Sequence, residues 1–279
     1  MAGESRQETL AMLRRQAKII RQKVMTTLLA AGSGHVGGSL SSVDILTALY
    51  FHFMKVDPKN PKWGDRDRFV LSKGHASAAL CPTLSERGFF PKDLLDTFNK
   101  LDSPFSMHPD MLKIPGVDMS TGSLGHGLSI ALGMALGARL QKKSFRTFVV
   151  LGDGELAEGS VWEAAMAAAH FKVDNLVAFV DRNRLQVDGF SKDILNTEPV
   201  ADKWRAFGWA VREIDGHDME AILDTVEAVP FEKGKPSVIV ANTVKGKGLP
   251  FAENQIGFHY HDVDEEMVKE SLEILEKAE

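Results

Sequence analysis

The sequence predicts an α/β fold in which a mostly parallel sheet is covered by helices on both faces. Short apolar runs rich in β-branched residues alternate with helical patterns in the second half of the chain, as buried parallel strands require. The runs are FVVL, LVAFV, WAVREI and SVIVAN, and the helical patterns between them lie near 156–170, 200–207 and 218–228. Because no linker, repeat or low-complexity stretch interrupts the sequence, we expect one domain over residues 1–279.

The first half of the chain predicts helices around one short strand. Residues 8–31 have the apolar spacing of a helix. GSGHVGGSL at 32–40 interrupts it, and SSVDILTALYFHFMKV resumes a helix with one of its serines as the cap. RFVLS at 68–72 predicts a buried strand, and KGHASAAL opens the next helix. The Pro-, Gly- and His-rich residues 101–123 predict a long functional loop, and LGHGLSIALGMALGARL predicts a closely packed helix.

Composition narrows the class of protein. The formal net charge is −5, whereas a nucleic-acid binder would show a basic excess. A lone cysteine, Cys81, excludes an internal disulfide and fits a reducing compartment. The apolar runs are shorter than the roughly 18 residues of a membrane span, and the first residues lack the apolar segment of a signal peptide. We therefore expect a soluble, cytoplasmic protein that binds neither nucleic acid nor membrane.

The stretch LGDGELAEGS at 151–160 combines a phosphate-binding pattern with negative charge. A strand followed by a glycine-rich turn and a helix often cradles phosphate, yet this turn carries Asp153, Glu155 and Glu158. Two like charges about 4 Å apart repel by roughly 4 kcal/mol at an effective dielectric near 20. A cation between the turn and the phosphate removes this repulsion, and Mg²⁺ binds carboxylate and phosphate oxygens in this way. Asn183, after the next apolar run, offers a second oxygen ligand at the same sheet edge.

The same turn allows two other interpretations. GDGELA also fits the dinucleotide-binding pattern G-x-G-x-x-A, with Asp181 about where a ribose-binding acid would lie. In that case a bare pyrophosphate would face Asp153 without a cation. A polar turn with no ligand is the simplest alternative. The Mg²⁺–diphosphate interpretation explains the acids, the glycines and Asn183 together.

Histidines are concentrated in the expected loops. Five of the nine lie within two positions of a glycine or proline in expected loops: His35, His75, His108, His126 and His259. Imidazole exchanges protons near neutral pH, so these residues could line one pocket for an oxygen-rich substrate. His52 and His170 lie in helical patterns, and His217 precedes a helix, so all three receive structural interpretations. KGKGLPFAE at 245–253 is either a phosphate-facing loop or a solvated turn.

These blocks together resemble the N-terminal third to half of transketolase. GDG at 152–154, with Asn183 thirty positions after Asp153, resembles the thiamine diphosphate signature. The resemblance runs in order from about residue 10 to 265: GSGHVGGSLSSVDIL, RDRFVLSKGHASAAL, HPD, GVDMSTGSLGHGLSIALGMALG, and KGKG leading to FH. It implies a thiamine diphosphate- and Mg²⁺-dependent enzyme that moves a two-carbon ketol unit from a ketose phosphate to an aldose phosphate.

The resemblance also implies a role for each matching residue. The Mg²⁺ ligands would be Asp153, the Asn183 side chain and the Leu185 carbonyl. The diphosphate would be held by Gly154, Asn183, His75 and His259. The cofactor's rings would contact Gly122, Ser123 and Leu124. The catalytic side chains facing the sugar would be His35, His108 and His259. Two further acids match residues at the family's subunit interface, Glu158 and Glu163. Ser123 and His126 replace the proline and glutamine of the family's usual GPLGQG.

A larger departure is length. Full-length members are more than twice as long, and their middle domain supplies, across a dimer interface, the glutamate that protonates the cofactor's aminopyrimidine. No glutamate here matches that residue by motif. We therefore expect a separate C-terminal transketolase subunit with the pyrimidine domain, in a two-plus-two heterotetramer.

Other functions stay open at this point. The chain could be a subunit of a 2-oxo acid dehydrogenase, or of a two-chain ketolase for an unusual sugar. The histidine blocks suit polyhydroxylated substrates better than the apolar acyl chain of a 2-oxo acid. A non-catalytic regulatory relative is the third possibility, and the intact Asp153 and Asn183 count against it.

Overall fold

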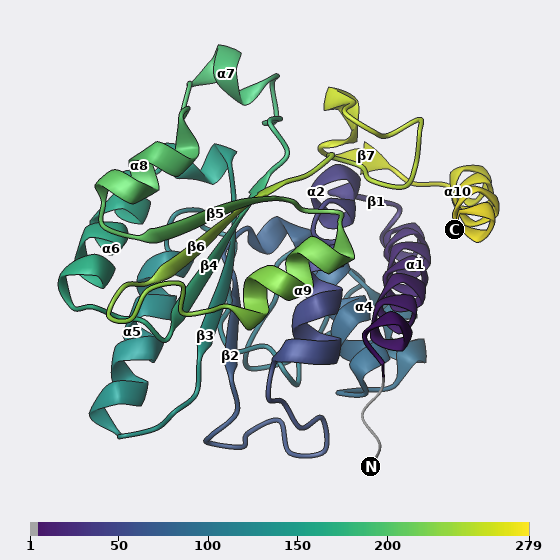
Figure 1. The fold of residues 1–279 in the computed structure, drawn as a ribbon. Coiled ribbons are helices and arrows are strands. Elements are labelled where there is room, and N and C mark those ends of the chain that lie inside the picture. Colours follow the sequence, from purple (N-terminus) through teal and green to yellow (C-terminus); the bar gives the residue numbers. More distant parts are fainter. Residues whose placement is uncertain (1–4, 279) are drawn as a thin grey trace.

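A five-stranded parallel sheet forms the centre of the molecule (Figure 1). The computed structural model describes residues 5–278. The strands, in their order across the sheet, are β2 (Arg68–Leu71), β3 (Thr147–Gly152), β4 (Leu176–Arg182), β6 (Ser237–Asn242) and β5 (Ala210–Asp215). Every neighbouring pair is parallel. This arrangement confirms the α/β class and each strand that the sequence predicted.

Helices cover both faces of this sheet, as expected (Figure 1). On one face lie α5 (Gly127–Leu140), α6 (Gly159–His170) and α8 (Val200–Ala206). On the other lie α1 (Arg6–Ala31), α3 (Val43–Ala48), α4 (Ser77–Arg87) and α9 (Met219–Glu227). Side chains of β3 alternate between the two cores: Phe148 packs with the α1 side and Val149 with the α5 side. This alternation explains why the central strands β3, β4 and β6 have continuous apolar runs, whereas β5, at the edge of the sheet, also carries Arg212 and Glu213.

The N-terminal part matches its expected helices with differences at their ends. Ser5 and Glu8 form a capping box that starts α1. The segment 32–40, expected to interrupt the helix, holds the two-residue strand β1 (Ser33–Gly34) and the short helix α2 (Val36–Leu40). Ser42 precedes α3, but its hydroxyl donates to the Gly38 carbonyl at 2.9 Å instead of capping the helix.

Two parts of the C-terminal half differ from the sequence expectation. The helix expected from 156 begins at Gly159, because a 3₁₀ turn occupies Gly154–Ala157. A helix that was not predicted, α10 (Glu265–Lys277), packs on α1, where the Lys18 ammonium donates to the Glu276 carbonyl at 3.1 Å. Two further short elements are α7 (Ser191–Ile194) and β7 (His261–Asp262), and β7 pairs antiparallel with β1.

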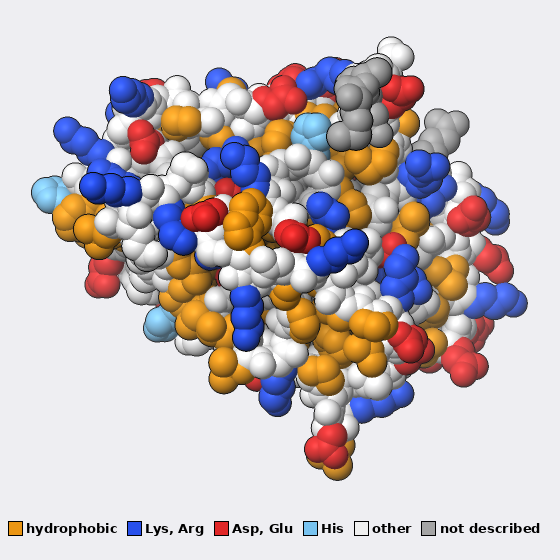
Figure 2. Space-filling model, turned by 90° about the horizontal axis from the view of Figure 1, so that it is seen from below, with side chains coloured by type: hydrophobic (Ala, Val, Ile, Leu, Met, Phe, Trp, Pro, Cys, Tyr) orange, Lys and Arg blue, Asp and Glu red, His pale blue; other side chains and the backbone are white. Residues whose placement is uncertain are grey.

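The face at the amino-terminal ends of the strands has a mixed surface. Figure 2 shows that lysines and arginines are interspersed with acids and apolar side chains on this face. None of the helices in residues 5–278 combines the length and apolar character that crossing a bilayer demands.

Candidate functional site

A cavity of about 500 Å³ opens beyond the carboxyl ends of the strands. Segments that follow β2, β3, β4 and β6 all contribute to it, together with the segments around His35 and His259. Ligands of open α/β sheets bind at this end. Residues predicted from the sequence that line the cavity are His35, His75, Leu124, Asp153, Gly154, Glu158, Asn183, Leu185 and His259.

Asp153 is buried at the end of β3 and is held by backbone donors. Its carboxylate accepts hydrogen bonds from the Gly154 amide at 2.9 Å and the Arg184 amide at 2.7 Å. The Ser191 hydroxyl donates to the same oxygen as Arg184, at 3.3 Å. Burial, with the nearby Asp181 charge, raises the pKa of Asp153 to about 6. A cation beside this carboxylate would offset that cost of burying its charge.

Asn183 and Leu185 lie on the neighbouring loop after β4. The Asn183 side-chain oxygen accepts from the Leu185 amide at 3.1 Å, which fixes the orientation of the side chain. The Leu185 carbonyl accepts from the Lys245 ammonium at 3.1 Å. The Lys245 ammonium therefore contacts the Leu185 carbonyl oxygen, which the resemblance assigned to Mg²⁺ as a ligand.

The three acids of the 151–160 turn have different surroundings. Glu155 is buried and needs no cation, since its carboxylate accepts from the Gly125 amide at 2.8 Å and the Gly152 amide at 3.0 Å, and from the Ser72 hydroxyl. Glu158 is exposed at the rim of the cavity. The expected repulsion between a bound phosphate and the acids of this turn therefore concerns mainly Asp153, because the Glu155 carboxylate already accepts hydrogen bonds from the protein.

Two lysines line the cavity, of which Lys245 belongs to the stretch considered above as a phosphate-facing loop and Lys73 had no role assigned from the sequence. Lys73 pairs with the fully buried Asp181 and donates to the Gly38 carbonyl at 2.7 Å. Lys245 is only 2% exposed, so the solvated-turn interpretation of KGKG is wrong. Burial, with the Lys73 charge, lowers the pKa of Lys245 to about 8. The glycines around Lys245 were the one sequence signal that could have singled it out. The Asp181 carboxylate is occupied by Lys73 and by the hydroxyls of Ser41, Ser42 and Thr243, which leaves no place for the ribose contact considered above.

Four of the predicted histidines form one continuous cluster. The ring of His35 lies 4.8 Å from that of His75 and 5.5 Å from that of His259, and His75 lies 4.6 Å from His108. Burial, with the positive groups nearby, lowers the pKa of His35 to about 4 and of His259 to about 3. Burial and His108 also lower the pKa of His75. The rings of His35, His75 and His259 are consequently neutral near pH 7.

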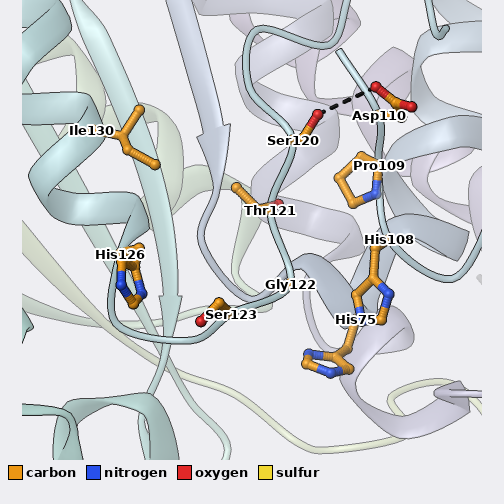
Figure 3. A pocket seen from close by; sticks show the side chains of 10 residues that line it. All are labelled: His75, His108, Pro109, Asp110, Ser120, Thr121, Gly122, Ser123, His126 and Ile130. Carbon is orange, nitrogen blue, oxygen red and sulfur yellow. Dashed lines mark hydrogen bonds between the residues drawn. The ribbon is translucent and has the colours of Figure 1, made fainter. Parts of the chain in front are cut away.

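A second cavity of about 660 Å³ adjoins the histidine cluster (Figure 3). His75 and His108 lie together on one side of it, while Ser123 and His126 come from the loop before α5. Gly122 has φ of 153°, and a Cβ there would lie 2.6 Å from the His108 ring. Glycine is therefore needed for the loop to approach the histidine this closely.

The remaining predicted residues lie elsewhere. Glu163 is exposed on α6 and lies outside the lining of both cavities. His170 is exposed at the end of α6. His217 does precede a helix, but its ring is also bonded to a buried carboxylate, that of Asp44, which sequence reasoning did not find. Its position in IDGHD gave no signal for that partner.

The residues present fit a diphosphate bound through a cation. The His35 Nδ1 and Gln186 Nε2 atoms are buried without a hydrogen-bond partner among residues 5–278, which leaves polar atoms available to a ligand. The ammonium groups of Lys73 and Lys245, beside the Asp153 carboxylate, suit an anion bound with a metal ion. Within the described part of the chain no group of three or more His, Cys, Asp or Glu side chains could hold a metal, and the other oxygens that the resemblance names beside Asp153 are those of Asn183 and Leu185.

Fold and site together define an α/β domain of the kind that binds a phosphorylated cofactor beyond its strand ends. The family model described as "Transketolase, thiamine diphosphate binding domain" matches residues 12–276. The chain therefore belongs to the transketolase family of enzymes, as the N-terminal, thiamine diphosphate-binding part.

Curated relatives of similar length share this region. The chain is 47% identical over 265 residues to the 6-deoxy-6-sulfo-D-fructose transketolase subunit SqwG of a Clostridium species, covering 95% of this chain and 96% of the relative. It is 43% identical over 277 residues to one subunit of the apulose-4-phosphate transketolase of Phocaeicola vulgatus, covering 98% of this chain and 97% of the relative.

Solved structures agree with this assignment. The transketolase of Campylobacter jejuni superposes with a TM-score of 0.89 at 33% identity, covering 95% of this chain and 43% of that one. The chain thus spans less than half the length of this solved transketolase. It corresponds in length to the relatives named as subunits.

Proposed function

We propose that this chain is the diphosphate-binding subunit of a two-chain, Mg²⁺-dependent transketolase. It would transfer a two-carbon ketol unit from a ketose phosphate, or a related anionic ketose, to an aldose phosphate. The observation that carries the proposal is the convergence of Asp153, Asn183, two lysines and three histidines of the cluster at one cavity. Relatives of matching length that are named as transketolase subunits support it.

Three oxygens would hold the metal ion in this proposal. They belong to the Asp153 carboxylate, the Asn183 side chain and the Leu185 carbonyl, and the Lys245 ammonium would move from that carbonyl toward the diphosphate. Lys73, Lys245, His75, His259 and the Gly154 backbone line the same cavity and would hold the diphosphate. Gly122, Ser123 and Leu124 would contact the cofactor's rings.

When bound, thiamine diphosphate supplies the nucleophilic carbon and the electron sink that cleavage of a bond beside a carbonyl requires. The histidines of this chain would act on the sugar. Because His35 and His259 are neutral at pH 7, they can donate a hydrogen bond from one ring nitrogen and accept one at the other. His35, with Nδ1 free among the described residues, and the exposed His108 would orient the hydroxyls and the carbonyl oxygen.

A second chain is part of the proposal. The relatives that act on sulfofructose and apulose phosphate are named as single subunits of their transketolases, which implies a partner chain for those proteins. We propose that a chain with the pyrimidine domain completes the site here, in a two-plus-two assembly in which Glu158 and Glu163 lie near the interface.

Reconstitution tests the function directly. The purified chain is mixed with the product of the adjacent reading frame, thiamine diphosphate and Mg²⁺, and ketol transfer to ribose 5-phosphate is assayed. We expect activity only with both chains present. A well-folded mixture that binds the cofactor and transfers no ketol unit would count against the proposal.

The donor sugar needs its own test, because the two relatives are named for different sugars. Xylulose 5-phosphate, fructose 6-phosphate, 6-deoxy-6-sulfofructose and apulose 4-phosphate form a suitable panel. We expect a ketose donor to be used in preference to pyruvate or a branched-chain 2-oxo acid. Turnover of the oxo acids alone would favour the dehydrogenase alternative.

A further inference from the structure

Three buried side chains from distant parts of the sequence meet beside the turn that carries Lys245. Asp44 of α3 accepts hydrogen bonds from the Arg21 guanidinium of α1 at 3.0 Å and from His217 Nδ1 at 2.7 Å. The side chains of Arg21, Asp44 and His217 are 11%, 7% and 10% exposed. We call these three residues the Asp44 cluster. It lies outside the lining of the 500 Å³ cavity.

The Asp44 cluster is bonded to the backbone on both sides of Lys245. The Val244 amide donates to His217 Nε2 at 2.8 Å. On the other side, Arg21 Nε donates to the Lys247 carbonyl at 3.3 Å. The Asp44 carboxylate therefore orients both His217 and Arg21. These two side chains bond to the backbone before and after Lys245.

The hydrogen bonds also fix the tautomer of His217. Because an amide can only donate, Nε2 must present its lone pair to Val244, and the ring proton is on Nδ1. That N–H then donates to Asp44, an arrangement in which a carboxylate sets the orientation of an imidazole. Although burial opposes the charge, Arg21 and His217 lower the pKa of Asp44 to about 2, so its carboxylate is charged at neutral pH.

The backbone of the turn that carries Lys245 cannot readily adopt another conformation that would replace these contacts. Gly246 has φ of 81°, and a Cβ there would lie 2.4 Å from the Ala252 carbonyl oxygen. The Gly246 amide also donates to the Gly37 carbonyl at 3.0 Å. The Lys245 ammonium lies 2.7 Å from His259 Nδ1, so a shift of the turn would displace a lysine and a histidine together.

We propose that the Asp44 cluster is a positioning unit, in which His217 holds the Val244 amide so that Lys245 faces the cofactor's diphosphate. The inference rests on the proposed function, because it assigns Lys245 to the diphosphate. All three side chains lie outside the lining of the cavity that we propose for the cofactor. Their effect is on cofactor affinity and not on the reaction that follows.

Two conservative substitutions separate the two hydrogen bonds of His217. In His217→Gln, the side-chain oxygen can reach the position of Nε2 and accept from Val244, while the bond to Asp44 is weakened. In His217→Asn, the shorter amide can donate to Asp44 but leaves Val244 without its acceptor. If His217 only stabilised the fold, the two variants would change cofactor affinity by equal amounts.

The experiment measures two quantities. In the full chain alone, hydrogen exchange reports protection of the Val244 amide, which we expect in His217→Gln and not in His217→Asn. In the complex with the partner chain, titration with thiamine diphosphate at saturating Mg²⁺ gives the Kd. We expect His217→Asn to weaken binding about tenfold and His217→Gln less than about threefold, as for other residues that orient a ligand-binding group. Turnover at saturating cofactor should be nearly unchanged in both.

Asp67→Asn is the matched control. Asp67 is another buried carboxylate that accepts from backbone amides, those of Lys55 and Arg146, but it lies at the start of β2, at the opposite end of the strands. We expect it to lower stability without changing the Kd. Equal losses of affinity in both His217 variants, or no loss in either, would overturn the inference while leaving wild-type binding intact. A wild-type complex without cofactor binding would overturn the proposed function and this inference with it.

Discussion

Asp153 and Glu155 are two positions apart in one turn, yet their carboxylates are held by different parts of the protein. Asp153 accepts from the amide of Arg184, on the loop after β4. Glu155 accepts from the amides of Gly125 and Gly152, one of which belongs to the loop before α5. Both residues line the cavity with Asn183, but the Glu155 carboxylate is bonded to amides of the segments that support the cavity. We expect substitutions at the two positions to have separable effects.

Asp153→Asn should remove the Mg²⁺ dependence of cofactor binding. An amide retains an oxygen for one of the two donors, Arg184 or Gly154, which bond to different carboxylate oxygens, and it loses the charge that a hard cation prefers. Asp153→Ala would instead leave those buried donors unpaired, at about 1–3 kcal/mol of stability. Calorimetry of the complex with and without Mg²⁺ measures the effect, and unfolding by urea checks the fold. Unchanged Mg²⁺-dependent binding in Asp153→Asn would show that the metal assignment is wrong.

Glu155→Gln should act on stability and leave the metal dependence in place. The amide nitrogen would face at least one of the donors that Glu155 now accepts from, so we expect a loss of about 1–3 kcal/mol in the free energy of unfolding. Urea unfolding of the full chain measures the loss, and Glu158→Gln, an exposed change in the same turn, is the control. A stable Glu155→Gln variant with lost Mg²⁺ dependence would reverse the roles given to the two acids.

The sequence alone was sufficient to predict the strands of the sheet and many of the residues that line the cavity. Buried parallel strands have apolar runs that are short and distinct, and their carboxyl ends meet at one edge, so Asp153 and Asn183 could be placed together from the pattern alone. The histidine blocks were placed with them by resemblance. These inferences depend on local patterns and on sheet topology.

Contacts between distant segments could not be predicted in the same way. Lys73 and Asp181 form a buried pair across 108 positions, and His217 bonds to Asp44 across 173 positions. Each of these residues has an ordinary local sequence, and charged residues usually lie in solvent. The missed helix α10 has a strong apolar face, but its acids and lysines are equally typical of a solvated tail.

His108→Ala should reduce turnover more than cofactor affinity. His108 is exposed, lines the 660 Å³ cavity and contacts His75, while the metal-binding oxygens proposed above belong to the other cavity. We expect kcat to fall by about 10²-fold, the lower range for loss of a group that assists proton transfer or polarises a reacting oxygen. Steady-state kinetics and cofactor titration are compared with His170→Ala, another exposed histidine. A tenfold loss of cofactor affinity with normal kcat would place His108 at the cofactor instead.

The stability of the chain without cofactor should fall in mild acid, in part through His35. Burial, with His75, His108 and the two lysines nearby, lowers the folded-state pKa of His35 from 6.5 to about 4. Between these values the unfolded chain binds a proton that the folded chain does not, so stability is fully present above pH 6.5 and is lost as the pH falls toward 4. Replacing the ring removes this contribution. The difference in urea midpoint between pH 7 and pH 5 should therefore be smaller in His35→Asn than in the wild type. Equal differences in the two proteins would show that His35 is not held neutral by its surroundings, and that the histidine cluster is open enough to accept protons before a ligand binds.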